Sequence, residues 1–179
     1  MRISIIGYSA SGKSTFAKQI GEILNLPILH LDKVNFLANW KEREVEESKK
    51  IVADFIKNNK NFVIEGNFYK FSLERFKLSD KIIFFNFDRI TCLCQAIERY
   101  NTYRGKVRES MSEGCYEKLD LEFLYWILIG GRTKDRIERY NKMIQEYKDK
   151  IIVVHNRGEV NKLLEKIKLN KTLENINFV

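Results

Sequence analysis

The sequence predicts an α/β protein of the doubly wound kind, in which helices cover both faces of a sheet of five parallel strands. Short apolar runs alternate with helical patterns along the 179 residues, and this order is typical of parallel α/β folds. One run, 81–87, is apolar along its length, as in a central strand that is covered on both faces. No linker rich in proline, glycine or serine interrupts the order. We therefore expect one three-layer domain over residues 1–179.

The first predicted strand, Ile3 to Ile6, runs directly into the most specific pattern of the chain. Residues 7–15 carry the complete pattern G-x-x-x-x-G-K-[ST] of a phosphate-binding loop, or P-loop. Gly7 lets the chain turn off the strand, and Gly12 lets backbone N–H groups point at an anion. Lys13 reaches the β- and γ-phosphates of a nucleotide, and the Ser14 hydroxyl can bind Mg²⁺.

A helix follows the loop, because residues 14–24 carry apolar side chains at helical spacing. The loop amides and the N-terminus of this helix then act on the same phosphate. The sequence therefore predicts ATP and Mg²⁺ as cofactors. The loop residues expected to bind the nucleotide are Gly7, Ser9, Ala10, Ser11, Gly12, Lys13, Ser14 and Thr15.

Two acidic residues follow the next two predicted strands. The apolar segment 26–31 ends at Asp32, and the strand 62–65 ends in Glu65 itself. Ligands bind at the carboxyl edge of an open parallel sheet, so both carboxylates are candidate site groups. Glu65 would join Ser14 at the metal, as an acid of Walker B type that acts through water. Alternatively, Asp32 caps a helix or a turn, and Glu65 forms a salt bridge with a surface lysine.

The remaining elements are indicated by periodicity and by the residues that end them. Asparagines at 58, 59 and 61 end one helical pattern, and the central strand stops at Asp88. The expected elements are a helix over 41–57, a helix from about 90 to 100, a strand over 150–154 and an amphipathic helix after residue 158. The tail after Leu169 shows no clear pattern.

A basic segment over 101–118 follows the helix at 90–100. It contains Arg104, Lys106 and Arg108 and has little apolar content, so we expect a mobile lid that closes over a ligand. Further arginines, Arg132, Arg136 and Arg139, come from the helical stretch after it. Arginine grips phosphate bidentately, whereas lysine acts as a point charge. The alternative for each arginine is solvation or an ion pair on a helix face.

Composition limits the classes of partner and compartment. The net charge of +8 and the pI near 9.3 fit either nucleic-acid binding or a site for small polyanions. We favour small polyanions, because the basic residues are not interleaved with aromatic residues in a nucleic-acid motif. No apolar run reaches the length of about 20 residues that a membrane span needs. The odd number of cysteines, 3, and the strand at the very N-terminus lead us to expect a cytoplasmic protein.

These residues resemble the P-loop small-molecule kinases related to adenylate kinase and, more closely, the bacterial DNA topology modulation proteins of the FlaR type. The resemblance covers nearly the whole chain. Glu65 departs from the group, in which Asp is usual at this position. Beyond the loop, the matching motifs are His30-Leu31-Asp32, Ile64-Glu65-Gly66-Asn67, Tyr103-Arg104-Gly105 with Arg108, Met111-Ser112-Glu113-Gly114-Cys115, Glu117-Lys118, Asp120 and Glu122-Phe123-Leu124.

The resemblance implies a kinase that transfers the γ-phosphoryl of ATP to a small acceptor, a nucleotide or a nucleoside. The catalytic residues would be Lys13, Asp32, Arg104, Arg132 and Arg136, with Arg139 as an alternative to Arg136, while Arg99 and Asn156 would border the adenine. Asp32 would act as a base if the acceptor attacks through a hydroxyl. The lid holds only Cys115 where some adenylate kinases have four zinc-binding cysteines, so we expect no zinc. The alternative function is a nucleotide-binding regulator that contacts DNA and influences its topology.

Overall fold

The computed structural model describes residues 1–173 and confirms the α/β class. Within this range the strands form one parallel sheet in the order β2-β3-β1-β4-β5. Strand β3 has the predicted bounds, and the ends of the other strands differ from the prediction by one or two residues. The strands are β1 (Arg2–Gly7), β2 (Ile28–His30), β3 (Phe62–Glu65), β4 (Lys81–Phe85) and β5 (Ile151–Val154).

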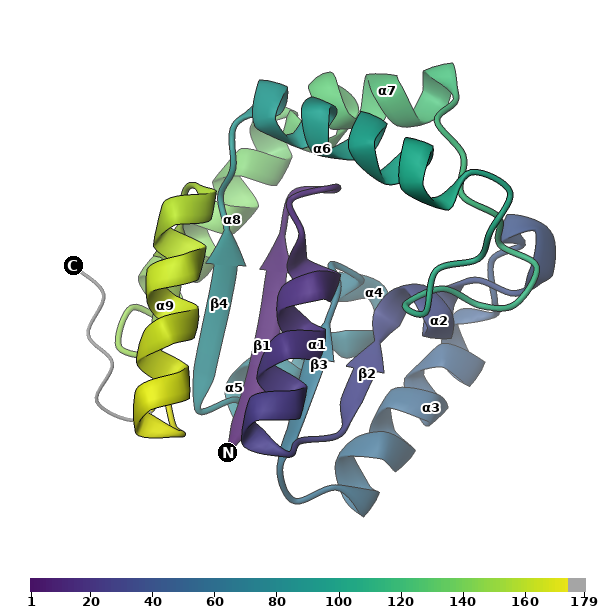
Figure 1. Cartoon of the computed structure of the whole chain (residues 1–179). Helices are drawn as coiled ribbons and strands as arrows, with labels where there is room; N and C mark the ends of the chain where they lie inside the picture. The colour runs from purple at the N-terminus through teal and green to yellow at the C-terminus, as the bar shows by residue number, and fades with distance from the viewer. Residues whose placement is uncertain (174–179) are drawn as a thin grey trace.

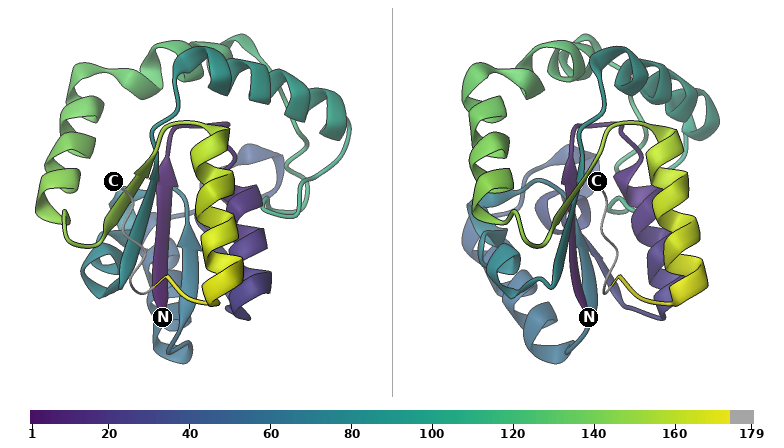
Figure 2. Two further views of the ribbon diagram at one scale, coloured as in Figure 1. Left: turned by 60° about the vertical axis from the view of Figure 1, so that its left-hand side comes forward. Right: turned by 90° about the vertical axis from the view of Figure 1, so that its left-hand side faces the viewer.

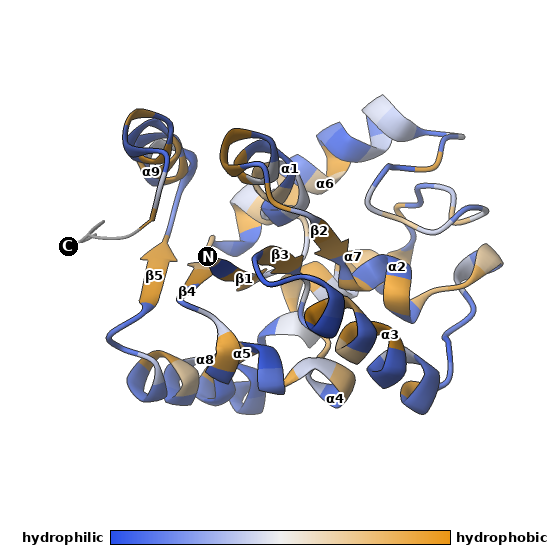
Figure 3. Ribbon diagram, turned by 90° about the horizontal axis from the view of Figure 1, so that it is seen from below, coloured by the Kyte–Doolittle hydropathy of each residue, from blue (hydrophilic) through white to orange (hydrophobic). Residues whose placement is uncertain are grey.

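Helices cover both faces of the sheet, which gives the predicted three layers (Figure 3). One face carries α1 (Lys13–Leu24) and α9 (Arg157–Asn170). The other face carries α3 (Val45–Asn58), α4 (Tyr69–Ser72), α5 (Glu74–Leu78) and α8 (Lys134–Glu146). Two more helices, α6 (Arg89–Tyr103) and α7 (Leu121–Leu128), cross above the carboxyl ends of the strands (Figures 1 and 2). They form a roof over the edge where ligands bind in such sheets.

The strands pack as buried apolar ribbons. Ile3, Ile5, Val63, Ile82 and Ile83 are all fully buried, and burying each such side chain stabilises the fold by roughly 1.5–3 kcal/mol. The parallel register places Glu65 beside Ile5 of β1 and beside His30 of β2. The sheet core therefore brings the end of β3 next to the P-loop. None of the helices in residues 1–173 is long and apolar enough to cross a membrane.

Three local predictions need correction. Strand β2 ends at His30, and Asp32 lies in the short helix α2 (Leu31–Asn35) instead of at a strand end. Leu31, Val34 and Asn35 are buried at helical spacing, so α2 packs one face on the core directly after the strand. The predicted helix at 41–57 begins only at Val45, after the 3₁₀ turn η1 (Ala38–Trp40). Helices α4 and α5 lie between the strands β3 and β4, where the sequence analysis predicts no helix.

The lid segment 101–118 continues α6 to Tyr103 and has no helix beyond it. It does not stand free, because Met111 and Cys115 are buried. Ser112 Oγ donates to the carbonyl of Lys33 at 3.1 Å. The N–H of Asn39 donates to the carbonyl of Gly114 at 3.3 Å. The lid therefore packs on residues 33–40, and its mobility remains a prediction.

Candidate active site

The P-loop has the backbone shape that its glycines permit. Gly7 and Gly12 have φ of 141° and 87°, in the region that favours glycine. A Cβ at Gly7 would lie 2.4 Å from the carbonyl oxygen of Phe85, so no larger residue fits against β4. The Asn67 side chain accepts from the Gly7 N–H at 3.0 Å and donates to the Gly7 carbonyl at 2.6 Å. These contacts fix the point where the loop leaves the sheet.

Lys13 lies inside the loop, with 8% of its surface exposed. Its ammonium Nζ donates to the carbonyl of Tyr8 at 2.8 Å. Burial lowers the pKa of Lys13 from its ordinary value, and the carboxylates of Glu65 and Asp32 oppose this shift. The lysine is therefore held where phosphate groups meet a P-loop, next to the two predicted acids.

Glu65 lies at the centre of a hydrogen-bonded cluster at the end of β3. Glu65 is 2% exposed. Its Oε2 accepts a hydrogen bond from Ser14 Oγ at 3.1 Å and lies 3.0 Å from His30 Nδ1. Burial raises the pKa of Glu65, but the His30 hydrogen bond, the Lys13 charge and the Ser14 hydrogen bond together bring it below its ordinary value. No lysine forms a salt bridge with Glu65 in residues 1–173, so the alternative of a surface salt bridge is wrong. The oxygen donors of Ser14 and Glu65 fit Mg²⁺.

Asp32 is half-buried in the first turn of α2. Burial raises its pKa, the negative charge of Glu65 raises it further, and the charges of Lys13, Arg108 and Arg99 oppose the shift. Although Asp32 does not end a strand, it faces the same charges as the predicted site residues. A carboxylate whose pKa is raised is a better proton acceptor than an ordinary carboxylate.

Two arginines meet on Glu117, a residue that enters the sequence analysis only as part of a family motif and without a role. Arg99 Nε and Nη2 lie 2.8 Å from Glu117 Oε1, and Arg108 Nε lies 2.5 Å from Oε2. The Glu117 side chain is 2% exposed. Glu117 therefore connects α6 to the lid and fixes two positive charges that act on Asp32. No sequence spacing rule predicts a contact of this kind, because all three residues are brought together by the path of the lid.

Arg157 is the second residue that sequence reasoning missed. A Cβ at Gly12 would lie 2.3 Å from Arg157 Nη2, so the guanidinium group rests directly on the P-loop glycine. The Gln95 side chain of α6 accepts a hydrogen bond from Arg157 Nη2. The predicted Asn156 instead caps α9, where its Oδ1 accepts from the Glu159 N–H at 3.0 Å. In this turn, Arg157 is the residue that contacts the P-loop.

The three other predicted arginines have different surroundings. Arg104 is exposed and lies 6.0 Å from the ring of Tyr100. Arg132 Nη2 donates to the carbonyl of Phe87 at 2.7 Å, and its guanidinium lies 3.5 Å from the Tyr8 ring. Arg136 lies over Trp126, 4.4 Å from the ring. Arg132 therefore braces the P-loop in this conformation, and the catalytic roles of all three stay predictions.

Comparisons with known proteins identify the fold. No protein-family model and no curated protein matches the chain. Among solved structures, it is similar to a shikimate kinase from Acinetobacter baumannii in complex with shikimate, with 18% identity and a TM-score of 0.56 over 97% of this chain and 95% of that chain. A shikimate kinase from Bacteroides thetaiotaomicron has 17% identity and a TM-score of 0.52, over 96% of this chain and 99% of that chain.

A deoxyadenosine kinase from M. mycoides, with the products dCMP and a flexible dCDP bound, has 16% identity and a TM-score of 0.51 over 96% of this chain and all 100% of that chain. At these identities the likeness shows the fold alone, and it confirms the P-loop kinase fold expected from the sequence. The resemblance to the FlaR-type group rests on the sequence motifs.

Proposed function

We propose that this protein is an ATP- and Mg²⁺-dependent phosphotransferase that transfers the γ-phosphoryl of ATP to a small acceptor, a nucleotide or a nucleoside. The observation that carries the proposal is the cluster around Glu65. Its Oε2 binds Ser14 Oγ at 3.1 Å, and its charge acts on Lys13 and Asp32. Phosphoryl transfer depends mainly on positioning and on charge neutralisation, and this cluster has the groups for both.

The P-loop residues hold the nucleotide. The loop amides and the α1 N-terminus bind phosphate oxygens, and Lys13 adds its charge at the β- and γ-phosphates. Ser14 and Glu65 would hold Mg²⁺, which supplies charge neutralisation between these phosphates when it is bound. Arg157 rests on Gly12, from which its guanidinium reaches the nucleotide as well.

Asp32 lies on the acceptor side of the cluster. If the acceptor attacks through a hydroxyl, the Asp32 carboxylate takes the proton as the new bond forms. If the acceptor attacks through a phosphate, no base is needed and Asp32 only orients the substrate. The neighbours in fold include a kinase solved with shikimate and one solved with the products dCMP and dCDP. A monophosphate forms when a hydroxyl attacks and a diphosphate forms when a phosphate attacks, so both kinds of acceptor are chemically reasonable on this fold.

The placement of the lid arginines favours this proposal over DNA binding. A DNA-binding surface needs its positive charges spread over an outer face. Arg99 and Arg108 instead point inward, onto the buried carboxylate of Glu117. Their charges serve the site between the lid and the P-loop.

A screen for ATP consumption tests the proposal. The unmodified protein is incubated with Mg-ATP and a panel of nucleosides, nucleoside monophosphates and small hydroxy acids, and ADP release is measured. We expect one acceptor class to stimulate ADP release well above the rate without acceptor. If every acceptor leaves that rate unchanged while ATP binds, the phosphotransferase proposal is wrong.

A further inference from the structure

A small cavity of about 50 Å³ lies between the P-loop, α4, α7 and α8. Its walls include Ser9, Asn67, Tyr69, Trp126, Arg136 and Arg139. Two contacts join it to the P-loop: Trp126 Nε1 donates to Ser9 Oγ at 3.0 Å, and Asn67 binds the backbone of Gly7. Tyr8 and Ser9 in the cavity wall belong to the P-loop, so an occupant of this cavity contacts the loop that holds Lys13.

Arg136 is the residue that sets the chemistry of the cavity. It is half-buried, and its guanidinium lies 4.4 Å from the Trp126 ring. Every other arginine of residues 1–173 that is buried or half-buried makes a hydrogen bond or a salt bridge, as Arg99 and Arg108 do with Glu117. Arg136 makes neither within this range. Its hydrogen-bond donors are therefore free for a ligand.

The rest of the cavity agrees with an anionic ligand. No carboxylate is among the lining residues, and Arg139 adds a second positive charge 5.3 Å from the Tyr69 ring. The cavity volume is about 50 Å³. One water molecule takes up about 30 Å³ in liquid water, so the cavity is less than twice that size. It has room for one carboxylate or phosphate group, and the ring or chain that carries the group must lie outside it, toward the P-loop.

We propose that this cavity binds the carboxylate or phosphate group of the phosphoryl acceptor, so that the acceptor is an anion and not a neutral nucleoside. The inference rests on the proposed function, because the adjacent P-loop makes the occupant an acceptor. Arg136 grips the anionic group, and Trp126 and Tyr69 hold the two guanidinium groups in place through their ring faces. The acceptor hydroxyl or phosphate that receives the phosphoryl then points at the loop.

Fluorescence of Trp126 tests the binding directly. Trp40→Phe leaves Trp126 as the only tryptophan, and this variant is titrated without nucleotide with matched pairs: dCMP and deoxycytidine, shikimate and its methyl ester, and inorganic phosphate alone. We expect saturable quenching by at least one charged probe and none by its neutral partner. Isothermal titration calorimetry on the unmodified chain repeats the comparison without a substitution. Equal binding of neutral and charged partners, or no binding by any charged probe including millimolar phosphate, overturns the inference.

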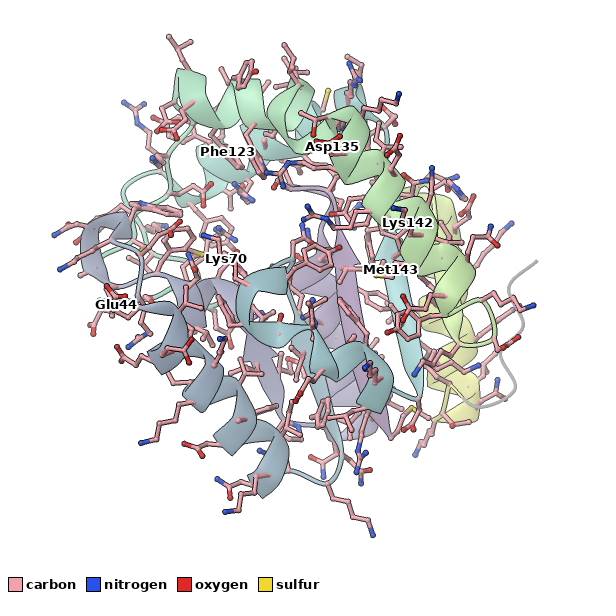
Figure 4. The ribbon with its side chains drawn as sticks, turned by 180° about the vertical axis from the view of Figure 1, so that it is seen from behind. Glu44, Lys70, Phe123, Asp135, Lys142 and Met143 are labelled. Atoms are coloured by element: carbon pink, nitrogen blue, oxygen red, sulfur yellow. The ribbon has the colours of Figure 1, made fainter. Side chains whose placement is uncertain are left out.

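Variants of α8 supply the matched control. Arg136→Gln should weaken binding of the charged probe about tenfold or more, since a hydrogen bond to a charged group is lost. Lys142→Gln should leave binding unchanged, because Lys142 is exposed beside the buried Met143 on the same helix (Figure 4). Unchanged binding in Arg136→Gln contradicts the inference even if ATP turnover persists. If the unmodified protein binds the charged probe but transfers no phosphoryl group to any acceptor, the proposed function is wrong while the anion-binding cavity stands.

Discussion

Two pairs of arginines differ in what holds them: the lid pair, Arg99 of α6 with Arg108 of the lid, and the α8 pair, Arg136 with Arg139. Arg99 and Arg108 share the buried carboxylate of Glu117, whereas Arg136 and Arg139 lie against aromatic rings and form no salt bridge within residues 1–173. Both pairs come from basic stretches that look alike in the sequence. The environment of each guanidinium therefore decides its role more than its position in the chain does.

The difference separates a structural charge from a binding charge. A guanidinium with a buried partner contributes to stability through that partner, and removing the partner leaves uncompensated charge behind. A guanidinium on an aromatic ring keeps its N–H donors free for an anion. We therefore expect the lid pair to affect folding strongly and the α8 pair to affect ligand binding.

The largest expected effect is on stability at the lid. Glu117→Gln should lower the free energy of unfolding by about 3 kcal/mol, because Arg99 and Arg108 lose their shared carboxylate. Arg136→Gln should lower it by about 1 kcal/mol at most, the scale of one exposed cation–π contact. Urea denaturation of both variants measures the two values.

Glu113→Gln is the matched control for the lid, since Glu113 is exposed in the same segment. Its unfolding free energy should equal that of the unmodified protein. If Glu117→Gln and Arg136→Gln lower the free energy of unfolding equally, the two arginine pairs do not differ in their contribution to stability.

The next effect concerns Asp32, on which the lid arginines act. Asp32→Asn should lower kcat by about 10²-fold with an acceptor that attacks through a hydroxyl, because the base is lost. With an acceptor that attacks through a phosphate, the loss should be much smaller. Steady-state kinetics on the acceptor found in the screen distinguish the cases. A rate equal to that of the unmodified protein on a hydroxyl acceptor would exclude Asp32 from catalysis.

Arg157 extends the comparison to a third environment, the P-loop itself. Arg157→Ala should raise KM for ATP about tenfold with little change in kcat, because one hydrogen-bonding charge beside Gly12 is removed. Lys162→Ala, on an exposed position of the same helix α9, should leave KM for ATP unchanged. An unchanged KM in Arg157→Ala would place the arginine outside the nucleotide site.

The smallest effect is the dependence of stability on pH at Asp32. Its pKa is raised above the ordinary value of 3.8, so the ionised carboxylate disfavours the folded state above its folded pKa. Asp32→Asn removes this penalty and should raise Tm at pH 7. The gain should shrink as pH falls through the folded pKa toward 3.8.

Thermal unfolding over this pH range measures the gain, with the exposed Asp54→Asn of α3 as control. A lower Tm for Asp32→Asn at pH 7 would show that the carboxylate stabilises the folded protein, contrary to the expected sign.

The sequence predicts those parts of the site that depend on local pattern. The P-loop combines glycines, a lysine and a following helix in adjacent positions, and the structure has the predicted strand before the loop and the predicted helix after it. Glu65 was predicted correctly at a strand end, because its strand is a short apolar run with a clear boundary. Asp32 was misplaced by one element, because α2 is only 5 residues long and so short a helix gives no clear period in the sequence.

The rest of the site depends on tertiary contacts that no local pattern encodes. Glu117 meets Arg99 and Arg108 only because the lid folds back on α6. Arg157 reaches Gly12 only because α9 and α1 share one face of the sheet. Helices α4 and α5 are held by aromatic contacts with distant segments, such as Phe68 with Phe36 and Phe76 with Tyr147. Such contacts join residues far apart in the chain.

The phosphotransferase proposal depends most on Lys13. An assay with ATP labelled in its γ-phosphoryl group and with the acceptor from the screen compares the unmodified protein with Lys13→Ala. We expect label to appear in the acceptor with the unmodified protein and to fall about 10²-fold or more in the variant, while circular dichroism shows both folded. Equal transfer by the folded Lys13→Ala protein, or label released only as inorganic phosphate, would overturn the proposal.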